Sequence, residues 1–375
     1  MPDSDSIPQK SLIDFENDPC RFQKKLLGWS HKNPRPMPWK GEKDSYKIWV
    51  SEIILQQTRV NQGWQYFERF VKAFPTVEAL ASADEMQVLK YWEGLGYYSR
   101  ARNLHAAARQ IVHDFDGHFP ETFHDLKTLK GVGDYTAAAI ASFAFNKPHA
   151  VLDGNVYRIL SRIFGIETII DLPKARSEFQ NLASRLLDEH NPGAFNQAMM
   201  DFGAICCTPA KPACTECPFN DTCRARLENK VSELPKRLEK RARKTRFFFY
   251  VKISQHGFSY VCKRESKDIW KGLYEFPVLE LENAEDFKLE KLESAFFKQK
   301  LPKGARWGEI SSEFTQLLTH QKVLARFVEL HLPPEIPVGF TKESALKKCI
   351  KVSESDLTKK IPLPKLIIGF LQKKI

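Results

Sequence analysis

Four cysteines in one short stretch constrain this chain more than any other feature of its sequence. They follow the spacing C-x6-C-x2-C-x5-C and are Cys207, Cys214, Cys217 and Cys223. Four thiolates so close together can close a tetrahedral site around zinc or hold a [4Fe–4S] cluster. The spacing alone leaves both metals open. Cys206 competes with Cys207 for the first ligand position, but its spacing to Cys214 fits less well.

The composition is that of a globular, basic protein. The 375 residues are enough for two or three domains, and the formal net charge is +11. That charge fits nucleic acid or a membrane surface, and it also suits a merely soluble basic protein. With no membrane-spanning stretch and no secretion signal, we expect a reducing, cytoplasmic location in which clustered cysteines bind metal. The remaining cysteines are scattered and are expected to be free thiols: Cys20, Cys206, Cys262 and Cys349.

Apolar periodicity divides the chain into a helical half and a mixed half. Helices are predicted over 46–60, 88–92, 100–115, 135–145 and 156–164. The basic run 235–246 predicts a solvated linker, or one that lies along phosphates. Strands are predicted over 247–253 and 258–262, around a turn at His256-Gly257, and they open a mixed α+β domain.

A hairpin with two glycines, Gly131 and Gly133, joins two of the predicted helices. Glycine permits the positive φ angles of a tight turn and lets a phosphate approach the backbone amides. The helix that begins near Tyr135 would then direct its N-terminal dipole at that anion. The pattern therefore predicts a helix-hairpin-helix that binds the DNA backbone, and an ordinary turn between helices is the alternative.

Two acidic residues are candidates for chemistry. Glu52 lies in the apolar stripe of its predicted helix, where an acid is rarely placed, although a partly exposed or paired residue at the edge of the stripe fits the periodicity equally well. Asp153 precedes the helix that begins near Val156. We expect Asp153 to be the N-cap of that helix, a role that is compatible with catalysis.

Three further segments complete a pattern of known type. They are W-V-S-E-I-I-L-Q-Q-T-R-V (49–60), G-L-G-Y-Y-S-R-A-R-N-L (94–104) and L-D-G-N-V (152–156). With the hairpin and the cysteines, they resemble the helix-hairpin-helix DNA glycosylases with an iron–sulfur cluster, and among these the adenine DNA glycosylase family. The resemblance is strong over residues 38–224 and continues more weakly through 270–277.

The resemblance implies an all-α, two-lobed helix-hairpin-helix glycosylase with an iron–sulfur loop, followed by an α+β Nudix-like domain. The expected parts are a helical glycosylase domain (1–230), a basic linker (231–246) and a Nudix-like 8-oxoguanine recognition domain (247–375). Within the first, a six-helix barrel is expected at about 45–155 and an iron–sulfur lobe at about 10–44 and 156–230. The implied cofactor is a [4Fe–4S] cluster on the four cysteines.

The resemblance also assigns catalytic roles. Glu52 matches the general acid that protonates the departing adenine, and Asp153 matches the residue that stabilises the oxocarbenium-like sugar. Asn155 and Tyr135 match residues that orient these carboxylates and the sugar. Bifunctional relatives carry a lysine at the position of Tyr135, whose amine forms a Schiff base. The tyrosine therefore predicts a monofunctional glycosylase that leaves the abasic strand intact.

A further set of residues matches positions that contact DNA or the lesion. They are Gln57, Thr58, Leu95, Tyr97, Thr319 and His320, in addition to Gly131 and Gly133. Many members have Phe-Ser-His where this chain has Leu318-Thr319-His320, so the hydroxyl and the imidazole are kept and the aromatic ring is lost. The second half also lacks the acidic metal box of Nudix hydrolases, so independent pyrophosphatase activity is not expected.

The expected partner is double-stranded DNA with adenine opposite 8-oxoguanine or guanine, bound by a monomer in the nucleoid. Two other functions remain open. One is a bifunctional pyrimidine glycosylase on the same fold, against which Tyr135 and the second domain argue. The other is a non-catalytic, metal-stabilised DNA-binding protein, against which Glu52 and Asp153 argue.

Overall fold

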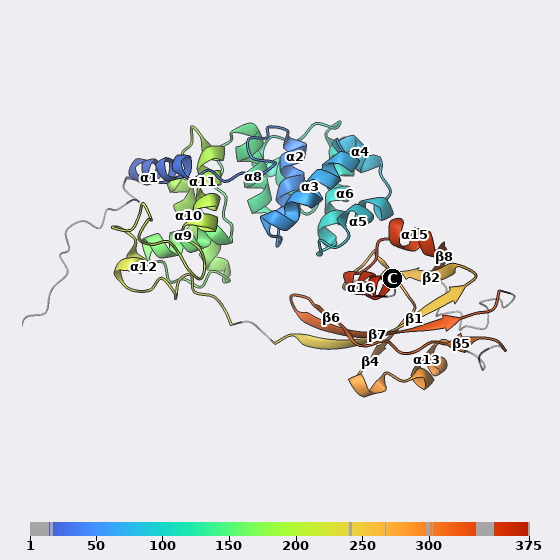
Figure 1. The fold of residues 1–375 in the computed structure, drawn as a ribbon. Coiled ribbons are helices and arrows are strands. Elements are labelled where there is room, and N and C mark those ends of the chain that lie inside the picture. The colour runs from blue at the N-terminus through green and yellow to red at the C-terminus, as the bar shows by residue number, and fades with distance from the viewer. Residues whose placement is uncertain are drawn as a thin grey trace, which may run out of the picture. The chain divides into compact units, whose positions relative to one another are not determined.

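The computed structural model describes residue 15 and residues 18–239, 242–266, 268–297, 301, 303–334 and 349–373. The polar N-terminus and residues 240–241 of the predicted linker lie outside these residues. The chain forms two compact units (Figure 1). Unit 1 comprises Met1–Val71, Thr76–Glu78 and Ala107–Glu239, and unit 2 comprises Lys72–Pro75, Ala79–Ala106 and Lys240–Ile375. The domain limits drawn from the sequence stay a prediction.

The part of the chain before the sheet is helical, which confirms the first half of the predicted fold. Its helices are α1 (Pro19–Lys32), α2 (Ser45–Leu55), α3 (Val60–Ala73), α4 (Val77–Ser82), α5 (Glu85–Trp92), α6 (Ser99–Asp114), α7 (Phe123–Thr128), α8 (Asp134–Phe145), α9 (Gly154–Phe164), α10 (Pro173–Leu186), α11 (Pro192–Ile205) and α12 (Arg224–Leu227). The segment predicted as one helix over 46–60 ends at Leu55 and resumes at Val60. Among the described residues, no helix is long and apolar enough to cross a membrane.

An aromatic core fixes the segment that carries the cysteines. Phe219, in the loop after Cys217, is fully buried. Its ring stacks on Phe22 of α1 at 4.8 Å between centroids and meets Phe202 of α11 edge-on at 5.6 Å. Burying an aromatic ring stabilises a fold by about 1.5–3 kcal/mol, so this loop is anchored by packing as well as by whatever its thiols bind.

Unit 2 contains a mixed sheet, and the two strands predicted around the turn at His256-Gly257 are confirmed. The strands are β1 (Lys244–Gln255), β2 (Phe258–Lys263), β3 (Tyr274–Glu275), β4 (Val278–Leu281), β5 (Arg306–Trp307), β6 (Phe314–Leu317), β7 (Gln321–His331) and β8 (Cys349–Ser353). The order β3-β2-β1-β7-β5 forms the main path, with β4 paired to β1, β6 to β7 and β8 to β2. β1 and β7 run parallel at the centre, from Lys244 opposite Gln321 to Ser254 opposite His331.

Helices cover both faces of this sheet (Figure 1). Alternate residues of β1 point to opposite faces, as in any strand. Phe249 joins a buried cluster with Leu292 of α13 (Leu289–Phe296). On the other face, the ring of Phe327 stacks between Tyr250 and Phe370 of α16 (Lys365–Gln372), at 5.0 and 4.2 Å between centroids. The short helix α15 (Glu354–Lys359) follows β8 directly.

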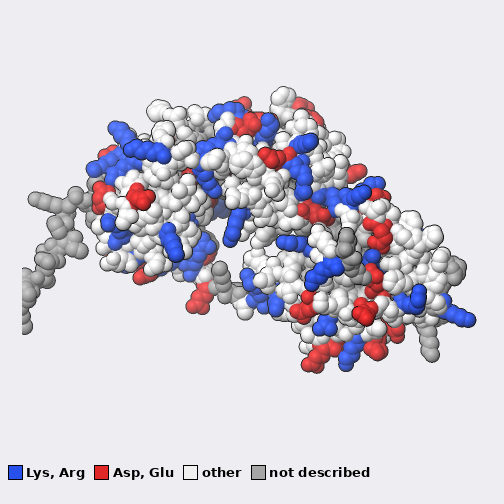
Figure 2. Space-filling model, viewed as in Figure 1, with Lys and Arg blue, Asp and Glu red and all other residues white. Residues whose placement is uncertain are grey.

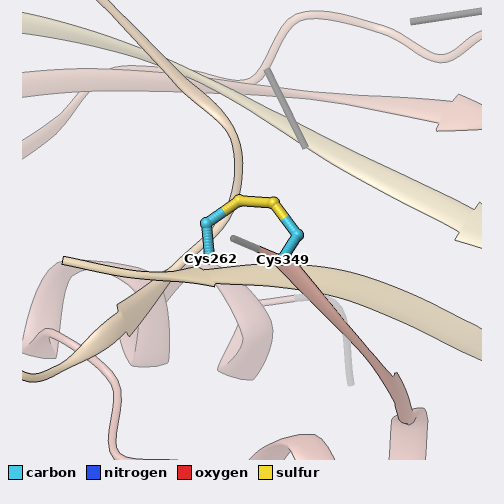
Figure 3. Close-up of a disulfide and its surroundings, with 2 residues drawn as sticks. All are labelled: Cys262 and Cys349. Atoms are coloured by element: carbon cyan, nitrogen blue, oxygen red, sulfur yellow. A yellow bond between two sulfur atoms is a disulfide. The ribbon is translucent and has the colours of Figure 1, made fainter. Parts of the chain in front are cut away.

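Two of the cysteines expected to be free are joined. Cys262 on β2 and Cys349 on β8 form a disulfide (Figure 3). The two residues are direct partners in the antiparallel register of these strands, so their side chains stand on the same face of the sheet. The spacing of 87 residues gave no sign of this pairing, because the pairing depends on the strand register. Cys20 and Cys206 are free thiols, as expected.

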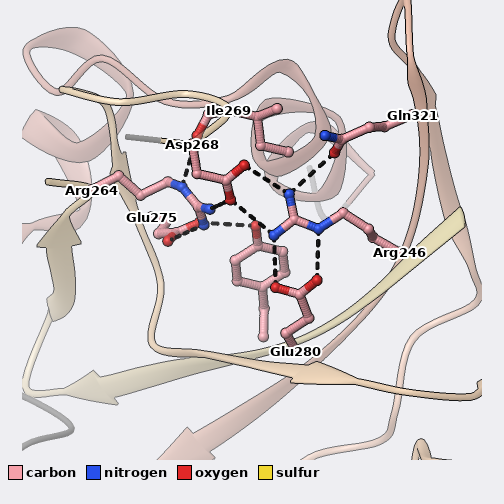
Figure 4. A network of polar contacts seen from close by, with 8 residues as sticks. Arg246, Arg264, Asp268, Ile269, Glu275, Glu280 and Gln321 are labelled. Carbon is pink, nitrogen blue, oxygen red and sulfur yellow. Dashed lines mark hydrogen bonds and ion pairs between the residues drawn. The ribbon is translucent and has the colours of Figure 1, made fainter. Parts of the chain in front are cut away.

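The end of the basic run is not a solvated linker. Arg246 lies within β1 with a side chain only 10% exposed, and it binds the carboxylates of Asp268 and Glu280 (Figure 4). Arg264 joins the same network through Asp268 and Glu275, at 2.7 Å to each. Strand β1 therefore begins earlier than its apolar pattern indicates, because acidic side chains of the same unit neutralise its arginine.

Candidate active site

Glu52 lies on the buried side of α2, where seven of its helical neighbours are also buried. Only 6% of its surface is exposed, and the hydroxyl of Tyr135 donates a 2.7 Å hydrogen bond to its Oε2. Burial raises the pKa of Glu52 to about 7, the negative charge of Asp153 adds to this shift, and the hydrogen bond from Tyr135 opposes it. The periodicity left burial and partial exposure open, and the structure shows that Glu52 is buried.

Asp153 is the N-cap of α9, as predicted. Its Oδ1 accepts a 2.8 Å hydrogen bond from the backbone N–H of Val156, and its Oδ2 accepts a 2.7 Å bond from Nδ2 of Asn155. Burial raises the pKa of Asp153 above its ordinary value, while these two bonds and the charge of Arg158 favour the ionised form. Two donors and a cation therefore stabilise a negative charge on Asp153, whereas Glu52 receives a single donor and lies in the field of another carboxylate.

One cavity of about 950 Å³ brings the predicted catalytic and hairpin residues together. We call it the front cavity, and its lining includes Glu52, Tyr135, Asp153, Asn155, Gly131, Gly133, Gln57 and Thr58. Gln57 is exposed and adopts a left-handed backbone with φ 58°, which is uncommon outside glycine. The acids, the hairpin glycines and two of the expected DNA-contact residues, Gln57 and Thr58, thus share one cavity.

The hairpin uses its two glycines differently. Gly131 has φ 79°, a left-handed conformation that a side chain would strain. Gly133 is the extended N-cap of α8, so of the two glycines only Gly131 uses the positive φ. The acid after it, Asp134, pairs with Lys127 at 2.6 Å and with Arg176. These two cations compensate for a negative charge placed at the helix N-terminus where the resemblance puts a phosphate.

Arg158 contacts Asn155 and was not among the residues predicted from the sequence. Arg158 is 7% exposed, and its Nη2 donates to Oδ1 of Asn155 at 2.8 Å and to the carbonyl of Gly203 at 2.7 Å. Its Nε donates to the carbonyl of Cys207 at 2.7 Å, which links the cysteine segment to the Asp153–Asn155 pair. The spacing of three residues between Asn155 and Arg158 on one helix was the available signal.

The predicted metal ligands surround one small cavity in unit 1. Its lining includes Cys207, Cys214, Cys217 and Cys223, and also Cys206. Arg162 donates from Nη1 to the sulfur of Cys207 at 3.5 Å. Within the described ranges, no three His, Cys, Asp or Glu side chains are arranged to hold a single metal ion.

The residues predicted to contact the lesion gather within unit 2. A cavity of about 580 Å³ there is lined by Tyr97, Thr319 and His320, among others. The hydroxyls of Tyr97 and Thr319 are hydrogen-bonded to each other, and Tyr97 is 48% exposed with φ 48°. Leu95 is 6% exposed and is packed away from solvent.

The helical fold and the hairpin beside two buried carboxylates define a helix-hairpin-helix DNA glycosylase. The family model described as "HhH-GPD superfamily base excision DNA repair protein" matches residues 50–185. Among solved structures, a thermostable thymine-DNA glycosylase is similar with a TM-score of 0.54 and 28% identity, over 57% of this chain and 100% of that one. An endonuclease III–DNA complex is similar in fold with a TM-score of 0.50 and 18% identity, over 56% of this chain and 97% of that one.

Curated relatives narrow the class further. The adenine DNA glycosylase of Buchnera aphidicola (subsp. Acyrthosiphon pisum) is 38% identical over 257 residues, which are 68% of this chain and 73% of that protein. The human adenine DNA glycosylase is 42% identical over 222 residues, 57% of this chain and 41% of that protein. The chain belongs to the adenine DNA glycosylase family. The predicted enzyme class, a DNA N-glycosylase, is confirmed at that level.

Proposed function

We propose that this chain removes adenine mispaired with 8-oxoguanine, or with guanine, in base excision repair, and that it does so without cutting the strand. The observation that carries the proposal is the pair of buried carboxylates in the front cavity. Glu52, with a pKa of about 7, keeps a proton to give, and Asp153 has the donors that favour its charge. Two carboxyl groups in different protonation states are what glycosidic bond cleavage requires.

The proposed reaction uses this difference in protonation between Glu52 and Asp153. Glu52 protonates the adenine as the bond from C1′ to the base nitrogen lengthens, and Asp153 stabilises the positive charge that develops on the sugar. Asn155 holds the carboxylate of Asp153 in place at 2.7 Å, and Tyr135 holds that of Glu52 at 2.7 Å. Water then adds to C1′ and gives a proton back to Glu52.

Tyr135 supports the monofunctional assignment. Its hydroxyl is hydrogen-bonded to Glu52, and burial raises its pKa well above the ordinary value of 10. A neutral phenol in this position cannot form the Schiff base by which a lysine amine leads to strand cleavage.

The proposed DNA contacts are the hairpin and the exposed Gln57. A turn at Gly131 leaves backbone N–H groups before α8 for a phosphate, with Lys127 and Arg176 beside them. On the face drawn in Figure 2, basic side chains are spread over the helical unit, with scattered acidic ones among them. Contacts of this kind position a duplex without reading its sequence.

We further propose that the sheet of unit 2 is the Nudix-like domain that reads the base opposite adenine. Thr319 supplies a hydroxyl and His320 an imidazole at the cavity of about 580 Å³. Leu318 lacks the aromatic ring of many relatives, so we expect discrimination between 8-oxoguanine and guanine to be weaker than in those relatives. Glu275 and Asp268 are bound to arginines, which supports the expectation that the domain is not a hydrolase.

The donor set fits a [4Fe–4S] cluster. Four thiolates around one zinc ion would stand about 3.8 Å apart, given zinc–sulfur bonds of about 2.3 Å. A cluster binds each thiolate through a different iron atom, and four cysteines around one cavity suit that arrangement. Membership of the adenine DNA glycosylase family, in which the resemblance implies an iron–sulfur loop, supports the cluster over zinc. When bound, it would cross-link the loop, and Cys207, Cys214, Cys217 and Cys223 would hold it.

The proposal is tested by single-turnover reactions on duplexes with adenine opposite 8-oxoguanine, guanine or thymine, with and without hot alkali. We expect strand breaks only after alkali and fastest opposite 8-oxoguanine. Asp153→Asn and Glu52→Gln should each abolish release while retaining duplex binding. Breaks without alkali, or an efficient covalent complex on borohydride treatment, would contradict the monofunctional assignment. Full base release by Asp153→Asn would revive the non-catalytic binding role.

A further inference from the structure

Glu52 lies on a second cavity as well as on the front one. This rear cavity has a volume of about 340 Å³. Three residues belong to both linings: Trp39, Glu52 and Gln197. Asp153 and the hairpin glycines line the front cavity and not the rear one. The two cavities therefore adjoin at the proposed general acid, on the side away from the sugar-stabilising carboxylate.

The lining of the rear cavity runs from exposed residues to the buried Glu52. Lys43, on the loop before α2, and Ala194, on the first turn of α11, are exposed residues of its lining. Ser51 and Glu52, by contrast, are 1% and 6% exposed. A path thus leads from the surface to the buried acid without passing the hairpin.

The walls of the rear cavity are fixed by polar contacts. The carboxylate of Glu42 accepts the backbone N–H groups of Lys43 and Asp44 at 2.8 and 3.0 Å, which locks the loop. Nε2 of Gln197 donates to the fully buried Asp201 at 3.1 Å, which leaves the amide oxygen as its second polar atom. Asp201 is held in turn by Lys40 at 3.0 Å. These contacts fix the shape of the rear cavity, so it is not a gap between loose loops.

Its size and lining suit water. At about 30 Å³ of liquid per molecule, this volume holds roughly ten waters. The residues of the lining that carry hydroxyl or amide side chains are Ser51, Ser142, Asn146, Asn191 and Gln197. A buried water needs two to four polar partners, and side chains of this kind can supply them.

We propose that the rear cavity delivers the hydrolytic water to Glu52 while DNA fills the front cavity. This inference rests on the proposed function. Each turnover consumes one water. The bond from C1′ to adenine breaks with a proton from Glu52, an oxygen–C1′ bond forms, and the water returns one proton to the Glu52 carboxylate. A flipped nucleotide in the front cavity excludes solvent there, whereas the rear mouth lies outside the hairpin and stays open.

The experiment uses the full-length protein and narrows the entrance of the rear cavity by adding bulky side chains at two exposed residues of its lining. Ala194→Phe and Lys43→Trp add bulk at exposed positions of the lining, and Ala106→Phe makes the same change on α6, away from both cavities. Adenine release is followed in single turnovers, in water and in water with methanol. Methanol captures C1′ as a methyl glycoside, so the ratio of glycoside to hydrolysed sugar reports how the nucleophile arrives.

We expect both plugs to lower the methyl glycoside share at least threefold, because methanol is larger than water, while Ala106→Phe and the wild type agree. Duplex affinity should stay unchanged in all four proteins. An equal share in the plugged and wild-type proteins would overturn the inference while the proposed function stands. If the wild type releases no adenine, the proposed function fails and the inference falls with it.

Discussion

Adding one methyl group at Gly203, by the substitution Gly203→Ala, should disturb the arrangement of the site around Asn155. Gly203 lies in α11, and a Cβ added there would stand 2.5 Å from Cβ of Asn155 and 3.1 Å from its Cγ. Ordinary contact begins near 3.4 Å, so Asn155 would have to retreat by about 0.9 Å. Arg158 binds both residues, through the carbonyl of Gly203 and the amide oxygen of Asn155, so it would be displaced with them.

The size of the effect follows from this displacement. A misplacement of about 1 Å in a catalytic group can cost about 100-fold in rate, equivalent to about 2.7 kcal/mol in the barrier. We therefore expect Gly203→Ala to slow single-turnover base release about 100-fold. Overpacking costs about 1–3 kcal/mol of stability, and about 0.5–1 kcal/mol is regained by removing a glycine from a helix. The protein should therefore still fold at 25 °C.

The matched control is Gly28→Ala in α1, where an added Cβ meets nothing within 4 Å. It should leave the rate unchanged and raise the free energy of unfolding by about 0.5–1 kcal/mol. Both variants are compared by single-turnover kinetics and urea unfolding. A Gly203→Ala protein that releases adenine at the wild-type rate would show that the position of Asn155 does not limit the chemistry, and the reasoning from this contact would be refuted.

Three further predictions address protonation, metal binding and the disulfide. Because only protonated Glu52 can donate, and its pKa is raised to about 7, base release should fall about tenfold per pH unit above pH 7; a rate that is flat to pH 9 would exclude this role. Cys207→Ser should lose iron–sulfur absorbance while Cys206→Ser keeps it, and the reverse result would exchange the two ligand assignments. Cys262→Ser opens a loop of 87 residues and should lower the free energy of unfolding by about 4–5 kcal/mol, measured in urea, whereas equal stability of wild type and variant without reductant would argue against a formed disulfide.

The sequence predicted those parts of the site that are local. An acid in an apolar helical stripe singled out Glu52 but left its burial open, and an aspartate before a helix was sufficient to predict the N-cap at Asp153. Helix α8 was also predicted, over residues 135–145. Each of these rests on neighbours within one or two turns, which periodicity reports directly.

The features that were missed depend on contacts between distant segments. The disulfide follows from the register of β2 with β8, and Arg246 is neutralised by residues 22 and 34 positions away. The close approach of Gly203 to Asn155 joins α11 to α9. One-dimensional patterns carry no register or helix-crossing information, so no reading of composition or periodicity supplies these contacts.

Two buried glutamates of this chain show why burial alone does not make an acid catalyst. Glu275 is 5% exposed and Glu52 is 6% exposed, and the hydroxyl of a tyrosine reaches each of them. Burial raises the pKa of both, but Arg264 lies 2.7 Å from Glu275 and opposes that rise, whereas the charge that acts on Glu52 is a second carboxylate. The two sites thus differ in the charge that acts on the buried glutamate: the guanidinium of Arg264 favours the ionised form of Glu275, whereas Asp153 adds to burial in favouring the protonated form of Glu52, the proposed general acid.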